Sequence, residues 1–139
     1  MAESKLTNKE NDKSDSSAVE LEFTINVTVN GDTVVFELNT SSAAKDLYGQ
    51  LPLNISAENY GNNEKIFHPP EKLSTATTPL VSGARSGTLA YYAPWNNVVM
   101  FYGDFGSAPG LYELGHTMSG AEHIHKISGT ISITKGAVK

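Results

Sequence analysis

Residues 21–29 alternate apolar and polar side chains without an exception, and this run constrains the fold more than any other feature. In an extended chain such alternation places every apolar side chain on one face, which is the pattern of a half-buried strand. Asn30 and Gly31 follow at once, and both residues tolerate the positive φ angles of a two-residue hairpin turn. Val34, Phe36 and Leu38 continue the alternation. The segment therefore predicts an antiparallel hairpin with one buried face.

Short elements with frequent turn signals fill the rest of the chain. A short helix is predicted to begin at a Ser41 or Ser42 cap and to end before Pro52, and one further helical turn is predicted within residues 118–125. Gly- and Pro-rich segments predict turns and loops between the strands. Residues 77–88 are expected to form a mobile loop. Residues 58–72 are expected to be irregular. Further strands are predicted at residues 53–55, 88–92, 98–102, 111–114 and 127–133.

Many short strands with little helix indicate a mostly β domain, and a closed barrel is the architecture that leaves no exposed strand edge. The run Val98–Phe101 is apolar at every position, which predicts a central strand covered on both faces. Seven of the 12 aromatic residues lie between Tyr91 and Tyr112. This band marks where the core, or a pocket at its rim, is expected.

The first 20 residues differ from the rest in composition, with no aromatic residue and many Lys, Glu, Asp, Asn and Ser. Such a segment cannot bury enough apolar surface to offset its ordering entropy. We expect a disordered polar tail over residues 1–20 and one barrel domain over 21–139. The tail fits two locations: a cytoplasmic protein with a disordered N-terminus, or a protein tethered outside the membrane after removal of a lipidated leader.

Composition excludes several classes of function. The chain has no cysteine, so thiolate catalysis and cysteine-ligated metal sites are absent. With a net charge of −5, a single arginine at position 85 and dispersed lysines, nucleic-acid binding is not expected. No apolar run approaches the ~20 residues of a transmembrane helix. We expect a monomer without a cofactor.

Three histidines lie close together in sequence, at positions 116, 123 and 125. In an extended segment His123 and His125 would point to the same side, as the ligands of a zinc ion do, and His116 could supply a third ligand. No carboxylate at a suitable spacing completes a known metal signature. We therefore expect surface or hydrogen-bonded histidines in place of a metal site.

Two groups of residues are candidates for ligand contact. Glu64 and Lys65 lie between Tyr60 and Phe67, where they could line a pocket or form an ion pair that pins a loop to the barrel. Trp95 follows Pro94 in a turn between two strands, where it could stack on a ligand or plug one end of the barrel.

The ordered set of motifs from residue 47 onward resembles the bacterial and archaeal cyclophilin-like domain family. The resemblance covers nearly everything from Leu21 to Ile133. Its motifs are Leu47–Leu53, then Tyr60 with Glu64–Ile66, then Gly87–Trp95, Val98–Gly103 and Pro109–Gly115. It implies a closed eight-stranded β-barrel with one or two short helices, similar to the prolyl isomerases called cyclophilins.

The resemblance supports a prediction of the fold more firmly than a prediction of the activity. Cyclophilins place a catalytic arginine in a Phe-His-Arg segment, whereas here proline follows Phe67 and His68. Arg85 is the only alternative guanidinium, and it lies in a glycine-rich segment. Rate acceleration in such enzymes is attributed largely to a fixed positive donor acting on the twisting amide.

We therefore expect a non-catalytic binding module for a small molecule or peptide. The alternatives are a divergent prolyl isomerase that uses Arg85 and an accessory domain tethered by its tail. The residues expected to contact a ligand are Tyr60, Glu64, Arg85, Trp95, Phe101 and Tyr102.

Overall fold

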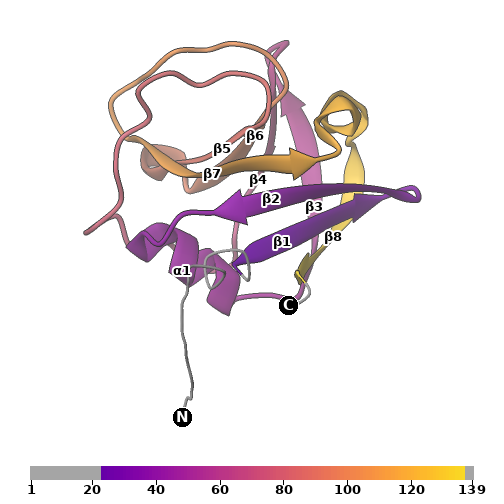
Figure 1. The fold of residues 1–139 in the computed structure, drawn as a ribbon, viewed down its shortest axis with the longest axis horizontal. Coiled ribbons are helices and arrows are strands. Elements are labelled where there is room, and N and C mark those ends of the chain that lie inside the picture. Colours follow the sequence, from indigo (N-terminus) through magenta and orange to yellow (C-terminus); the bar gives the residue numbers. More distant parts are fainter. Residues whose placement is uncertain (1–22, 137–139) are drawn as a thin grey trace, which may run out of the picture.

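The computed structural model describes residues 23–136, which form a closed antiparallel barrel of eight strands (Figure 1). Around the barrel the strands are hydrogen-bonded in the order β1-β2-β7-β5-β6-β4-β3-β8, and β8 pairs with β1 to close it. The mostly β, closed eight-stranded fold is thus confirmed. The strands are β1 (Thr24–Val29), β2 (Asp32–Leu38), β3 (Leu53–Tyr60), β4 (Glu64–Phe67), β5 (Thr88–Tyr92), β6 (Asn97–Phe101), β7 (Leu111–Ser119) and β8 (Gly129–Lys135).

The predicted hairpin is strands β1 and β2. Asn30 and Gly31 form its turn with φ angles of 50° and 86°, and Val29 pairs with Asp32 on either side of it. The apolar positions of both strands, such as Ile25 and Phe36, are buried in the barrel interior. The predicted tail over residues 1–20 and the first two residues of the predicted strand lie outside the described residues.

Two short helices cover opposite ends of the barrel (Figure 1). The predicted helix is α1 (Ser42–Gly49), and Ser41 caps it by accepting a hydrogen bond from the Ala44 amide at 3.2 Å. Its buried face, which includes Leu47, closes the end near the start of β1. At the other end, the 3-10 helix η4 (Ala121–Lys126) buries Ile124. Within the described residues, no helix is long and apolar enough to cross a membrane.

Strands β3 and β4 form a second hairpin where the sequence predicts irregular structure over residues 58–72. Tyr60 pairs with Glu64 across its turn. The prediction is confirmed for residues 68–72, which form neither helix nor strand, and is wrong for the hairpin. It fails there because β4 has only four residues and does not alternate: Ile66 is buried on one face while Lys65 and Phe67 are buried on the other. A strand that is covered on both faces loses the polar–apolar pattern by which strands are predicted.

Strand β7 extends to Ser119, five residues beyond the predicted strand. The predicted helical turn over 118–125 begins later, because Met118 belongs to β7 and Gly120, at φ 84°, is the residue before η4. Register shifts opposite both neighbours interrupt the alternation of β7. These irregularities hide the second half of the strand from a pattern of period two.

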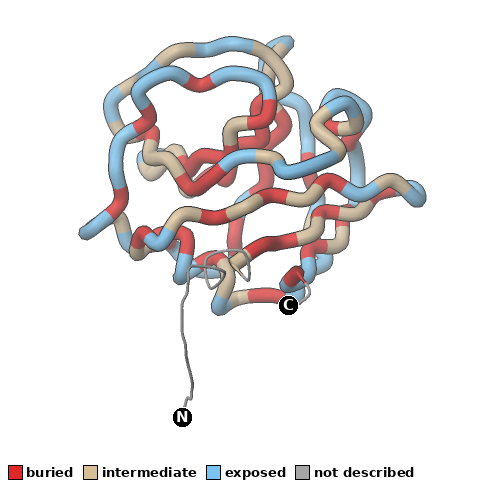
Figure 2. The backbone as a smooth tube through the Cα atoms, viewed as in Figure 1, coloured by how far each residue is buried: buried red, intermediate tan, exposed pale blue. Residues whose placement is uncertain are grey.

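Strand β6 separates two apolar clusters, and every one of its residues is buried, as predicted (Figure 2). Val98 and Met100 face the barrel interior, which forms the main core. Val99 and Phe101 face outward into a smaller cluster. This outer cluster consists of Ile66, Val81, Ala84, Ala90, Val99, Phe101 and Leu111, with Tyr92 and Ala108 packed against it.

Two long loops, residues 68–87 and 102–110, follow β4 and β6. The first part of the 68–87 loop is bonded to α1, whereas Val81 and Ala84 of its second part belong to the outer cluster. The two loops are joined to each other and to the barrel. The Phe105 amide donates to the Ala84 carbonyl and the Val81 amide to the Leu111 carbonyl, both at 2.9 Å. Of the predicted loop over residues 77–88, all but Thr88, which begins β5, lies outside the strands, and its Val81 and Ala84 are buried.

Candidate functional site

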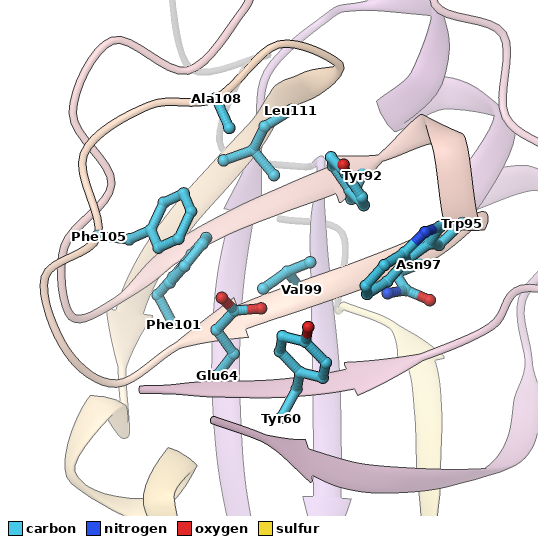
Figure 3. Close-up of a pocket in the computed structure, with 10 residues that line it drawn as sticks. All are labelled: Tyr60, Glu64, Tyr92, Trp95, Asn97, Val99, Phe101, Phe105, Ala108 and Leu111. Carbon is cyan, nitrogen blue, oxygen red and sulfur yellow. The ribbon is translucent and has the colours of Figure 1, made fainter. Parts of the chain in front are cut away.

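A cavity of about 220 Å³ opens on the outside of the barrel, beside the outer cluster (Figure 3). It lies over strands β5 and β6, between the β3–β4 hairpin on one side and the 102–110 loop on the other. The barrel interior is filled by the main core, so this cavity lies outside the closed sheet. Its lining residues are Tyr60, Glu64, Tyr92, Trp95, Asn97, Val99, Phe101, Phe105, Ala108 and Leu111.

Three aromatic side chains at the rim of the cavity are about half exposed: Tyr60 at 47%, Trp95 at 52% and Phe105 at 45%. Trp95 packs at near right angles to Tyr60 and to Tyr92, with ring centroids 5.6 and 5.3 Å apart. Phe105 lies across the opening, with its ring 5.5 Å from Phe101. Exposed aromatic rings that meet around a concavity are typical of ligand sites.

The turn that carries Trp95 is held in place from both sides. It is a 3-10 turn, η3 (Ala93–Trp95), that ends at Asn96 in the left-handed conformation, with φ 53°. The buried Tyr91 hydroxyl donates to Oδ1 of Asn96 at 2.7 Å. On the other side the Ala93 amide donates to the Gly110 carbonyl at 3.0 Å. Trp95 therefore lies outside the barrel at a fixed position, and the alternative in which it plugs a barrel end is wrong.

Asn97 lies beneath the aromatic rim and is only 3% exposed. Its side-chain Oδ1 atom is buried and has no hydrogen-bond partner among the described residues. A buried acceptor without a partner costs free energy of roughly 1–3 kcal/mol, so native proteins rarely leave one unless something else satisfies it. The oxygen has almost no exposed surface and is turned away from Tyr60 and Glu64 (Figure 3), so a ligand in the open cavity does not meet it unless the amide rotates.

Glu64 supplies the only carboxylate among the lining residues of the described chain. Its carboxylate points into the space between Tyr60 and Phe101 (Figure 3). Partial burial raises the pKa of Glu64 above its ordinary value, because leaving water disfavours the charged form. No ion pair or side-chain hydrogen bond to this carboxylate joins it to any other described residue. The group is thus partly desolvated, with no counter-charge from the part of the chain that the structure describes.

Lys65, the next residue, points to the opposite side of β4 and does not pair with Glu64. Its side chain is buried, with Nζ 5.7 Å from the centroid of the Tyr102 ring. Burial lowers the pKa of the Lys65 ammonium group. The alternative in which Glu64 and Lys65 form a loop-pinning ion pair is wrong, because neighbouring residues of a strand face opposite sides of the sheet.

Four of the six residues expected to contact a ligand meet in this cavity: Tyr60, Glu64, Trp95 and Phe101. Tyr102 lies elsewhere, where its hydroxyl donates to Oδ1 of Asn59 at 2.6 Å. Arg85 is exposed and does not line the cavity.

Sequence reasoning missed six lining residues. Tyr92, Asn97 and Val99 share the outward face of the β5–β6 hairpin with Phe101, so strand alternation around that turn could have identified them. The other three lie in the 102–110 loop or directly after it: Phe105, Ala108 and Leu111. No sequence pattern predicts the course of this loop.

The three histidines are held in separate surroundings. His116 on β7 has Nε2 at 3.4 Å from a Glu37 carboxylate oxygen. His123 lies on η4 beside Asp32, and the His125 ring lies 6.5 Å from the Tyr102 ring. The expectation that His123 and His125 share one side of an extended segment is wrong, because η4 is helical. Within the described residues, no group of three or more potential ligands could hold a metal ion.

Comparisons with known proteins place this barrel in a family. The model of a family described as cyclophilin-like matches residues 27–135. Among solved structures, the barrel is similar to that of a hypothetical protein from Archaeoglobus fulgidus, with a TM-score of 0.59 and 16% sequence identity over 84% of this chain and 97% of the other. At that identity the similarity concerns the fold alone. No curated protein matches.

Proposed function

This chain belongs to the cyclophilin-like family, and from that premise we propose that it is a binding module that holds a small molecule or peptide in its outer cavity without catalysing a reaction. The observation that carries the proposal is the open cavity, which three half-exposed aromatic rings and the partly buried Glu64 carboxylate line. Both features are costly in a domain that binds nothing, because water must cover the apolar rings and the carboxylate is partly removed from water.

The size of the cavity limits what it can enclose. At about 220 Å³ it is smaller than the roughly 300–1,000 Å³ pockets that enclose drug-sized ligands. It therefore suits a compact molecule, or one side chain or head group of a larger ligand or peptide. An accessory domain that only fills space would need no such opening, which favours binding over a purely structural role.

Prolyl isomerisation has less support. Prolyl isomerisation by cyclophilins depends on a fixed guanidinium beside the substrate proline. Arg85 is the only arginine in this chain. Its loop is fixed by the Ala84–Gly106 bridge, and Arg85 does not line the cavity. We expect background rates in a proline-peptide isomerisation assay for both the wild type and Arg85→Ala. Acceleration by the wild type that Arg85→Ala abolishes would support the isomerase instead.

A ligand screen by thermal shift and by the fluorescence of Trp95, the only tryptophan, tests the binding proposal. Hits are expected to stabilise the wild type and to lose their effect in Phe105→Ala, which removes one rim ring and keeps the fluorophore. Met118→Ala is the matched control, since Met118, at 52%, is about as exposed as Phe105 but lies outside the cavity. Hits that persist equally in both variants would contradict the proposal.

A further inference from the structure

The charge of the outer cavity is of one sign. The Glu64 carboxylate is the only charged group among its lining residues in the described chain, and when ionised it can only accept hydrogen bonds. Of the lining residues in the described part of the chain, none is positively charged. A ligand that pairs with this carboxylate must therefore bring a donor or a positive charge, whereas an anion would meet a like charge.

The aromatic rings near this carboxylate also favour a positively charged ligand. The faces of aromatic rings are negative and attract cations, most strongly for tryptophan. The edge-to-face packing of Trp95 on Tyr60 and on Tyr92 groups three rings at one end of the cavity, next to Glu64 (Figure 3). Rings and a carboxylate together form the kind of surroundings that hold organic ammonium ions.

We propose that the outer cavity binds an organic ammonium group, held by the rings of Tyr60, Tyr92 and Trp95 and neutralised by the Glu64 carboxylate. This inference rests on the proposed function, because it names the class of ligand for the same cavity. The small volume suits a single ammonium head group with a short apolar stem. Partial desolvation strengthens the attraction, since charges interact more strongly where water is excluded.

Three isosteric probes separate charge from shape: choline, its neutral analogue 3,3-dimethylbutan-1-ol, and the anion 3,3-dimethylbutanoate. Titration of the full chain, followed by calorimetry, is expected to give a Kd for choline about tenfold lower than for the alcohol, with the anion weakest. Glu64→Gln should raise the Kd for choline about tenfold and leave that for the alcohol unchanged.

Glu122→Gln is the control, because it changes the net charge equally at an exposed position on η4. Trp95→Ala should weaken both choline and the alcohol. Equal affinity for choline and the alcohol, lost in Trp95→Ala, would overturn the ammonium inference and leave the binding module standing. A preference for choline that Glu64→Gln does not change would also overturn it. If no probe binds the wild type, the cavity fails as this site, and the proposed function fails with it for ligands of this size.

Discussion

The two faces of strand β6 differ although both are buried. Val98 and Met100 face an interior that the two end helices seal, whereas Val99 and Phe101 face a smaller cluster beneath two loops and beside an open cavity. The inner face joins residues from all eight strands, and the outer face joins only half of the barrel to its loops.

This difference assigns separate tasks to the two faces. A closed interior maximises the apolar area removed from water and so stabilises the fold. The outer face keeps part of its aromatic surface exposed, which costs stability but leaves room for a ligand. In this barrel, stability is concentrated inside and binding is proposed outside, and paired substitutions can separate them.

The largest expected effect contrasts two phenylalanines. Phe36→Ala should lower the free energy of unfolding by about 3–5 kcal/mol, because it opens a cavity in the sealed interior. Phe105→Ala should cost no more than about 1 kcal/mol, because that ring is 45% exposed. Urea unfolding of both variants measures the difference. Similar losses for the two would show that the outer loops are as important to stability as the interior.

The adjacent valines give the closest matched pair. Val98→Ala should cost about 2 kcal/mol, since the surrounding core cannot easily collapse onto the lost methyl groups. Val99→Ala should cost about half as much, because its side chain already borders the open cavity. The same denaturant titrations test this. A larger loss for Val99→Ala would reverse the proposed division between the faces.

Gly110 tests how the Trp95 turn is held. At φ 82°, an added Cβ would lie 2.9 Å from Cδ of Pro94, so Gly110→Ala should cost about 1–2 kcal/mol and move the turn. Gly31→Ala is the control, because Gly31 has φ 86° with nothing within 4 Å of an added Cβ. Both variants should lose stability, but only Gly110→Ala should shift the Trp95 emission maximum. Unchanged emission would contradict this role of Gly110.

The smallest expected effect concerns pH. Because burial raises the pKa of Glu64, the folded state binds more protons than the unfolded state between pH 4.5 and the raised pKa. The Glu64 contribution to stability therefore falls as pH rises through that window. Glu64→Gln should melt slightly above the wild type at neutral pH and level with it below pH 4.5, measured by thermal unfolding across the pH range. A variant that melts lower at neutral pH would indicate a stabilising partner for the carboxylate.

The sequence predicts the strands whose apolar residues follow a regular pattern, either strict alternation or an uninterrupted run. The alternation that ends at Val29 identifies the first hairpin, and the uninterrupted run Val98–Phe101 identifies the strand with two buried faces. The hairpin around Gly61 escapes prediction, because β4 is buried on both faces and includes a buried lysine. Local pattern cannot show which distant loop covers a strand.

The cavity was predictable only in part for the same reason. In the sequence, Tyr60, Glu64 and Trp95 stand out because they are aromatic or charged residues in or beside turns. Arg85 and Tyr102 stand out equally, yet the fold places them outside the cavity. Phe105 reaches the rim because hydrogen bonds between two loops fix its position, and such long-range pairing leaves no local signal.

The most direct test of the central claim is a set of intermolecular nuclear Overhauser effects between choline and the full chain, with the valine methyl signals assigned from Val98→Ala and Val99→Ala. The account predicts contacts from the choline methyl protons to the Trp95 ring and to the Val99 methyl groups, and none to those of Val98 on the interior side of the same strand. Contacts to Val98, or binding that leaves Trp95 and Val99 untouched, would contradict it.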